Sequence, residues 1–225
     1  MRISIANRLT PAWSEASDFA RARYSKAFGA DVIPAPDYFI VAADDPASPA
    51  PAGAGPAAPL LACVGMTFDS ERGFFSERYL GGEPIEDAVA RVTGTSCSRD
   101  SIVEIGSLAG GGNQSGLELI RLTPIIAWCQ GLRYILCTAT GQLSRTLDRL
   151  GIPFKPIASA DSGTLEEFER QRWGTYYQQT PRTGVIPLHA IGALLSSATG
   201  RYRFADLDIE LTSGRPEKVL IDAAA

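Results

Sequence analysis

The sequence is poor in histidine, in paired cysteines and in positive charge, and each scarcity excludes a class of function. A single histidine, His189, is present, so neither a histidine-based zinc site nor any other metal site is expected. A Ser-His-Asp triad would depend on this residue, which we expect in an apolar helix. The cysteines are far apart, without a Cys-x-x-Cys pair, and are expected to be free thiols of a reducing cytoplasm. They are Cys63, Cys97, Cys129 and Cys137.

Long apolar runs are also absent. No stretch of about 18 apolar residues occurs, which is the length that a membrane-spanning helix needs. Residues 1–24 lack the apolar core of a secretory signal. The net charge of −4 leaves no broad cationic face for nucleic acid or for anionic membranes. We therefore expect a cytoplasmic protein without a nucleic-acid partner and without a membrane span.

The 225 residues carry the pattern of one well-packed domain. Apolar periodicity, capping residues and runs of β-branched or aromatic residues predict its elements. Helices are expected over 10–29, 83–92, 115–130, 141–149, 164–172 and 187–197, and strands over 37–43, 60–68, 101–109, 132–138, 154–158 and 202–211. This order predicts an α/β fold with one mixed β-sheet that is flanked by helices on both faces.

Two segments differ from the rest of this single domain, 1–225. Residues 44–59 are rich in proline, alanine and glycine and are expected to form a flexible loop between two strands of one sheet. From about residue 185 onward the chain is expected to add a helix and a strand as a C-terminal extension.

A glycine-rich turn follows the strand expected at 101–109, where the sequence reads SIVEIGSLAGGGNQSG. A strand, such a turn and a helix N-terminus direct free backbone N–H groups and the positive end of the helix dipole at one point, which is the chemistry of an anion site. The glycines match neither G-x-G-x-x-G nor a Walker loop, because no Gly-Lys-Ser/Thr follows. A flexible surface connection is the alternative interpretation.

This region resembles the acyl-CoA-binding core of GNAT-type N-acyltransferases. The resemblance lies in the strand, the Q-x-x-G-like turn and the helix, followed by YILCTAT and LDRLGIPF. It implies that the turn holds the pyrophosphate of the pantetheine donor, through Gly110, Gly111, Gly112, Asn113, Gln114, Ser115 and Gly116. Backbone N–H groups of Gly106, Ser107, Leu108 and Ala109 would polarise the thioester carbonyl.

A closer resemblance runs from about residue 19 to 188. It rests on RYSKAFGADV, FFSERYLGGEPIEDAV, RDSIVEIGSLAGG, LRYILCTATGQLSRTLDRLGI, IASADSGTLEEF and WGTYYQQTPRTGVIPL, which in this order are similar to the thermostable hemolysin family. The fold of that family is thought to be akin to GNAT enzymes and acyl-homoserine-lactone synthases. This chain has EIGSLA for EVGNLA and CTAT for FTAT. The lactone synthases carry an arginine where this chain has Ser107, so lactone synthesis is not implied.

Glu104 lies in the apolar strand expected at 101–109, so its carboxylate must be hydrogen-bonded, ion-paired or facing a cavity. A raised pKa there suits a general base that deprotonates an amine, and a structural ion pair with Arg78 or Arg99 is the alternative. Glu77 and Tyr79 match the family motif and are further catalytic candidates, with Tyr79 as the acid for a thiolate leaving group. For Glu77, Arg78 and Tyr79, solvated alternation along a strand is the alternative.

The aromatic segment WGTYYQQTPRTG is expected to wall an acyl or acceptor pocket, although a purely structural cluster is equally compatible with it. The substrate-binding candidates are Arg78, Trp173, Tyr176 and Tyr177. Thr138 and Thr140 are candidates for the border of the acyl channel. Cys137 lies in the middle of an apolar strand and is interpreted as core packing rather than as an acyl-accepting nucleophile.

These observations predict a GNAT-like N-acyltransferase that moves an acyl group from acyl-CoA or an acyl-carrier-protein thioester to a small amine or hydroxyl acceptor by direct attack. The donor is a co-substrate, and no tightly bound cofactor is expected. An acidic carrier protein would need basic residues on or near the flanking helices, for which the candidates are Arg121, Arg133, Arg145 and Arg149. A membrane-active haemolysin-type protein and a catalytically silent module that binds a lipid or a carrier protein are the alternatives.

Overall fold

The computed structural model describes residues 1–44, 59–110 and 114–198. Within these ranges seven strands form one sheet in the order β1-β2-β3-β4-β5-β7-β6. The strands are β1 (Arg2–Asn7), β2 (Tyr38–Ala43), β3 (Leu60–Thr67), β4 (Ile102–Gly110), β5 (Tyr134–Ala139), β6 (Lys155–Ser159) and β7 (Arg182–Pro187). β4 and β5 pair in parallel, and the other neighbours pair antiparallel. The prediction of a mixed sheet is confirmed.

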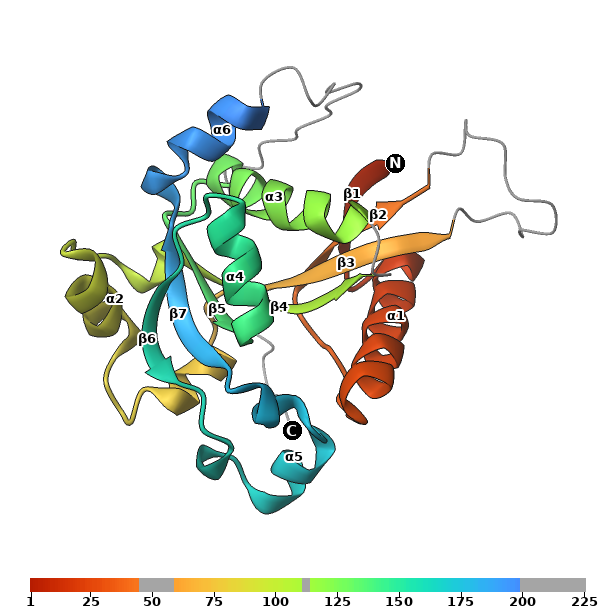
Figure 1. Cartoon of the computed structure of the whole chain (residues 1–225), viewed down its shortest axis with the longest axis horizontal. Coiled ribbons are helices and arrows are strands. Elements are labelled where there is room, and N and C mark those ends of the chain that lie inside the picture. The colour runs from red at the N-terminus through yellow and green to blue at the C-terminus, as the bar shows by residue number, and fades with distance from the viewer. Residues whose placement is uncertain (45–58, 111–113, 199–225) are drawn as a thin grey trace, which may run out of the picture.

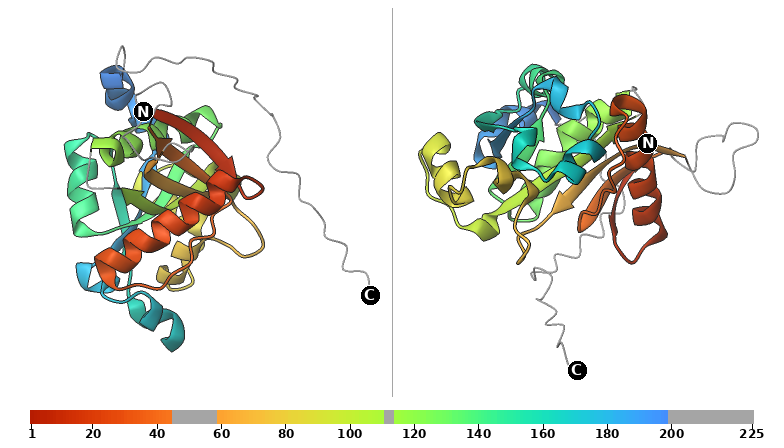
Figure 2. Two further views of the ribbon diagram at one scale, coloured as in Figure 1. Left: turned by 90° about the vertical axis from the view of Figure 1, so that its right-hand side faces the viewer. Right: turned by 90° about the horizontal axis from the view of Figure 1, so that it is seen from below.

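Helices cover both faces of the sheet (Figure 1, Figure 2). One face carries α1 (Pro11–Phe28) and α2 (Ile85–Thr93), and the other carries α3 (Gln114–Cys129), α4 (Gly141–Arg149) and α6 (Gly192–Ala198). Two further elements contribute to the site described below, the short α5 (Glu167–Arg172) and the 3-10 helix η1 (Phe75–Tyr79). No helix in the described ranges has the length and apolarity needed to cross a bilayer.

Alternation along the strands accounts for the two layers of core. Ile40, Val64, Val103 and Ile135 pack towards α3 and α4. Their neighbours in sequence face the opposite way, with Phe39 and Cys63 against α1 and Ile102 and Leu136 against α2. Near-continuous apolar runs in the central strands are what a sheet covered on both faces requires.

The ends of the first two helices agree with the predictions in position but not in every contact. α1 starts at Pro11 and ends at Gly29, whose φ of 65° is the left-handed conformation that glycine adopts without strain. Thr10 holds the N-cap position, yet its hydroxyl donates to the Asn7 carbonyl at 2.7 Å instead of capping the helix. Pro84 holds the N-cap position of α2, so that the helix starts two residues inside the range expected from the sequence.

Two strands, β1 and β7, were not expected from the sequence. β1 lies at the edge of the sheet, where even Ile5 is 49% exposed. Its sequence therefore lacks the apolar pattern of a buried strand. β7 occupies residues expected to form a loop and the start of a helix; the chain then makes a 3-10 turn at Leu188–Ala190 before α6. Its strand character depends on β5 and β6, which pair with it from both sides. The predicted final strand, 202–211, and residues 45–58 of the predicted loop lie outside the described residues.

Candidate active site

β4 and β5 pair as far as Ile105 and Cys137 and then separate. Beyond this point β4 continues with β3 alone, up to Gly110 opposite Ala62, while β5 continues with β7 alone. Among the described residues, one edge of β4 from Gly106 onward is therefore without a neighbouring strand. We call this opening in the sheet the fork.

A bulge in β4 lies where the fork opens. Ser107 has a φ of 51°, which is uncommon for a residue with a side chain, and the β3–β4 register shifts at the same point. The bulge inverts the alternation of β4, so that Ile105 and Leu108 both pack towards α3 and α4, whereas Ala109 packs against α1. The predicted donor residues Gln114, Ser115 and Gly116 open α3 immediately beyond β4, and Gly111, Gly112 and Asn113 lie outside the described residues.

Glu104 lies on β4 just before the fork and is 8% exposed. Its Oε2 accepts the Phe75 N–H at 2.7 Å, and its Oε1 accepts the Ser76 N–H at 2.9 Å and the Ser76 hydroxyl at 2.5 Å. Burial raises the pKa of Glu104, although these hydrogen bonds act in the opposite direction. The alternative of an ion pair with Arg78 or Arg99 is wrong, because both guanidinium groups pair with other carboxylates.

The hydrogen bonds of Glu104 leave it able to accept a proton. A carboxylate offers about four acceptor positions. Two on Oε1 and one on Oε2 are occupied by partners in the described ranges. The remaining position on Oε2 has no partner in these ranges, and a proton can be accepted there.

A chain of hydroxyl groups leads away from Glu104 across the sheet. The Ser76 hydroxyl lies 3.0 Å from Thr138 Oγ1, which lies 2.7 Å from Thr183 Oγ1. Ser76 and Thr183 are fully buried. Each hydroxyl can donate and accept, so the chain fixes the orientation of the Ser76 hydroxyl and offers a route for a proton.

The 3-10 helix η1 presents its N–H groups to Glu104 because an ion-pair network holds it in place. Arg99 donates to both oxygens of Glu77 at 2.7 and 2.5 Å and to Asp69 at 2.6 Å. Glu77 in turn accepts the Phe74 N–H at 2.7 Å. Burial alone would raise the pKa of Glu77, but the Arg99 guanidinium and this N–H lower it on balance, so Glu77 stays ionised. The alternation along a strand considered for this segment is therefore wrong.

An aromatic wall stands beside η1. It joins α1, η1 and the segment after α5 through successive ring contacts, and it consists of Tyr24, Phe28, Phe75, Tyr79, Trp173, Tyr176 and Tyr177. The hydroxyls of Tyr79 and Tyr177 are 2.6 Å apart. Burial, and then this hydrogen bond, raise the pKa of Tyr79 well above its usual range, so the phenol is neutral.

The segment that carries Trp173, Tyr176 and Tyr177 is fastened to the end of α1. The Thr175 N–H donates to the Phe28 carbonyl at 2.8 Å, and the Asp31 N–H donates to the Arg172 carbonyl at 2.7 Å. Gly174 has a φ of 52°, and a Cβ there would collide with the Phe28 carbonyl. This close approach explains why a glycine follows Trp173.

The remaining candidates are not among the hydrogen-bond partners of Glu104 in the described residues. Arg78 pairs with Glu169 at 2.6 Å and stacks over the Phe75 ring. Thr140 caps α4 by accepting the Leu143 N–H, and Arg145 is exposed on that helix. The burial predicted for Cys137 is confirmed, and it raises the pKa of the Cys137 thiol to about 12.

Three functional candidates were missed in the sequence. Ser76 stands between two aromatic and two charged residues of the family motif, and this unusual setting for a small hydroxyl was its one signal. Thr183 has no such signal in the sequence, because its partner Thr138 is distant along the chain. The same holds for the ion pair by which Arg99 holds Glu77.

The sheet order, with its fourth and fifth strands parallel and then separating, is that of the GNAT-like acyltransferase fold in the α/β class. The model of the family described as "Thermostable hemolysin" matches residues 6–191. The chain therefore belongs to the thermostable hemolysin family, as its motifs predicted. Comparison with curated proteins gives no match.

Solved structures share the fold at low sequence identity. The acyl-homoserine-lactone synthase LasI is 12% identical, with a TM-score of 0.54 over 87% of this chain and 94% of LasI. TofI, in a ternary complex with an inhibitor and MTA, is 13% identical, with a TM-score of 0.52 over 86% and 96%. FeeM, an N-acyl amino acid synthase from uncultured soil microbes, is 14% identical, with a TM-score of 0.51 over 86% and 99%.

Proposed function

We propose that the protein is an acyltransferase that moves an acyl group from a phosphopantetheine thioester to a small amine or hydroxyl acceptor. The donor is acyl-CoA or an acyl carrier protein. The observation that carries the proposal is the buried carboxylate of Glu104, which has a raised pKa and a remaining acceptor position beside the fork. The lactone synthase and the N-acyl amino acid synthase among the similar structures support acyl transfer in general.

The donor is assigned to the fork. The edge of β4 that β5 leaves uncovered supplies backbone groups for the pantetheine arm, and the N–H groups of residues 106–109 polarise the thioester carbonyl. The start of α3, at Gln114, follows directly and suits the phosphate end of the arm. The acceptor is assigned to the side of η1 and the aromatic wall, where Trp173 and Tyr177 are partly exposed and Tyr79 is buried beside Tyr177.

The chemistry follows from these positions. Glu104 takes a proton from the acceptor nitrogen, directly or through water, and the nitrogen attacks the thioester carbon. The new C–N bond forms, the C–S bond breaks, and the electron pair of that bond leaves with sulfur. The thiolate takes up the proton from Glu104 through solvent, and the neutral Tyr79 phenol, whose raised pKa makes it too weak an acid to give up its proton, donates a hydrogen bond to the leaving sulfur. The net change is one proton moved from nitrogen to sulfur. Glu77, held by Arg99, acts as a positioning residue rather than as a second base.

The proposal is tested by thiol release from a panel of acyl-CoA and acyl-carrier thioesters with mixed amines. The wild-type chain is expected to release thiol in the presence of an acceptor, and Glu104→Gln is expected to lose about 100-fold or more of this rate. Glu71→Gln makes the same change at an exposed carboxylate and should have no effect. Absence of turnover with every donor, together with leakage of liposomes without any thioester, would support the membrane-active alternative instead.

A further inference from the structure

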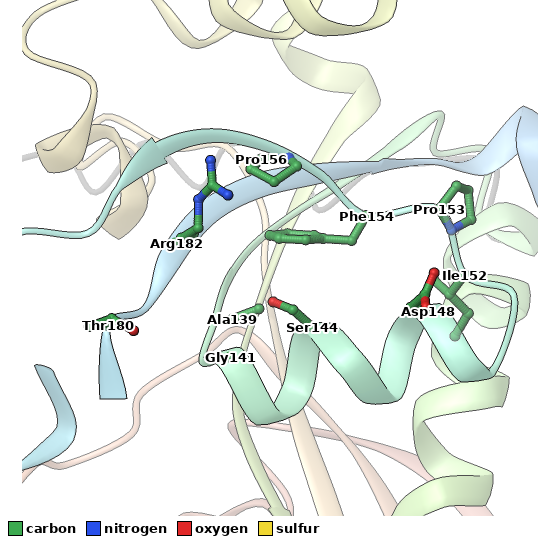
Figure 3. Close-up of a pocket in the computed structure, with 10 residues that line it drawn as sticks. All are labelled: Ala139, Gly141, Ser144, Asp148, Ile152, Pro153, Phe154, Pro156, Thr180 and Arg182. Atoms are coloured by element: carbon green, nitrogen blue, oxygen red, sulfur yellow. The ribbon is translucent and has the colours of Figure 1, made fainter. Parts of the chain in front are cut away.

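A pocket of about 380 Å³ lies between α4 and the strands β6 and β7 (Figure 3). This volume falls in the range of small-molecule sites. The residues used below are Gly141, Ser144 and Asp148 of α4, Phe154 before β6, Thr180 shortly before β7, and Arg182, the first residue of β7. The proposed acyl transfer uses none of them.

The pocket is separate from the proposed catalytic groups because it lies on the other face of the sheet. Thr183 points towards Thr138 and the hydroxyl chain of Glu104. Arg182 is its neighbour in β7, and neighbouring side chains of a strand point to opposite faces. Ile186, which shares the face of Arg182, packs in the core beneath α3 and α4.

The pocket runs along one face of α4. Gly141, Ser144 and Asp148 are spaced by three and four residues, which places them in one stripe about 10 Å long. Arg182 lies near the Gly141 end, and Asp148 marks the opposite end (Figure 3). The hydroxyls of Ser144 and Thr180 add polar groups to the lining.

The middle of the pocket is apolar. The Phe154 ring lies between the two charged ends, next to Pro156 (Figure 3). Gly184 makes room for this ring, because a Cβ there would lie 2.8 Å from its edge. The ring is thereby fixed over β7 as an apolar surface for a ligand.

The two charges at the ends have no counter-ions in the part of the chain that the structure describes. Neither the Arg182 guanidinium nor the Asp148 carboxylate makes an ion pair there, whereas Arg78, Arg91 and Arg99 each pair with a carboxylate. The dipole of α4 adds to these two charges, because its positive end lies near Arg182 and its negative end lies near Asp148.

We propose that this pocket binds a small extended zwitterion, in which a carboxylate and an ammonium group are joined by an apolar chain about 10 Å long. The carboxylate pairs with Arg182, the chain lies on Phe154, and the ammonium pairs with Asp148. An ω-amino carboxylate has these three parts in this order. The site is independent of the acyl-transfer site.

The test is calorimetric titration of the whole chain with four probes: ω-aminooctanoate, octanoate, octylamine and the shorter γ-aminobutyrate. We expect ω-aminooctanoate to bind at least tenfold more tightly than each of the other three. Arg182→Gln should abolish its advantage over octylamine, and Asp148→Asn should abolish its advantage over octanoate. Asp87→Asn, an exposed change on α2, should leave every affinity as in the wild type.

Three results would overturn this inference. Equal affinity for all three eight-carbon probes would identify an apolar groove whose charged ends do not contribute, and absence of binding would exclude the site. Retained selectivity in both Arg182→Gln and Asp148→Asn would place the zwitterion elsewhere. Thermal denaturation of the two variants confirms that each is folded. Because this titration does not measure thiol release, its outcome neither supports nor contradicts the proposed acyl transfer.

Discussion

Ser76 donates both its backbone N–H and its hydroxyl to one oxygen of Glu104, at 2.9 and 2.5 Å. The same hydroxyl lies 3.0 Å from Thr138 Oγ1, so it joins the carboxylate to the hydroxyl chain on β5 and β7. The η1 helix therefore sets both the orientation of Glu104 and its affinity for a proton.

Replacing Ser76 by alanine tests this relationship. The hydroxyl lowers the pKa of Glu104, so in Ser76→Ala the pKa is expected to rise and the acidic limb of the kcat/KM profile to move to higher pH. At neutral pH the rate is expected to fall by about tenfold, because the remaining N–H groups still hold the carboxylate. If the acidic limb of the kcat/KM profile is unchanged in a variant of wild-type thermal stability, Ser76 does not influence the pKa of Glu104.

The pH dependence of the wild type follows from the raised pKa of Glu104. A general base works when it is ionised, so kcat/KM is expected to be high above the folded-state pKa and to be lost as the pH falls through it. This limb should lie above the usual range of a glutamate, since burial is the main cause of the shift. Steady-state rates between pH 4 and 9, with buffers of constant ionic strength, measure it. A limb in the ordinary glutamate range would contradict the assignment.

The Arg99–Glu77 pair is predicted to act on Glu104 through η1. Arg99→Gln breaks three ion pairs, with Asp69, Glu77 and Glu86, whose side chains are about two-thirds to three-quarters buried, and we expect a loss of about 1 kcal/mol in the free energy of unfolding. We also expect kcat to fall about tenfold with little change in KM, because the N–H groups of Phe75 and Ser76 lose their fixed position.

A matched control separates this effect from stability. Arg91→Gln breaks the pair with Glu83 at the start of α2, away from Glu104. It should reduce stability no more than Arg99→Gln does and leave kcat unchanged. The double change Arg99→Gln with Glu77→Gln should cost less than the sum of the single changes, as expected of two residues in one network. Additive losses in kcat would mean that the two residues act separately.

Tyr79 is predicted to donate a hydrogen bond to the leaving sulfur. Tyr79→Phe keeps the ring and removes the hydroxyl, so kcat is expected to fall by about tenfold to 100-fold. Tyr177→Phe removes the partner hydroxyl at 2.6 Å but leaves that of Tyr79, and a smaller fall is expected. The rates are measured under saturating donor. Equal losses in the two variants would favour a shared packing role of the aromatic wall.

Most helices and strands of the fold could be predicted from local patterns, because each has apolar periodicity or capping residues within its own sequence. Glu104 was identified because a carboxylate within an apolar strand needs a partner or a cavity. For α1, Pro11 marks the first residue of the helix and Gly29 marks its end. β7 has no comparable signal, since it is six residues long, contains Gly184, and becomes a strand by pairing with β5 and β6.

The partners of Glu104 could not be predicted for a related reason. Ser76 is 28 residues away in sequence and Thr138 is 62 residues from Ser76, so their contacts arise from packing alone. The sequence offered Arg78 and Arg99 as partners by charge, but tertiary structure directs them to Glu169 and Glu77. Charge complementarity therefore predicted a cationic partner, whereas the partners of Glu104 are two backbone N–H groups and a hydroxyl.

The most direct measurement is single-turnover acyl transfer, with donor affinity determined on the same samples, for the wild type, Glu104→Gln and Cys137→Ala. We predict that Glu104→Gln binds the donor with wild-type affinity and transfers at least 100-fold more slowly, and that Cys137→Ala transfers at the wild-type rate. Undiminished transfer by Glu104→Gln, or an acyl group trapped on Cys137, would contradict direct attack assisted by Glu104.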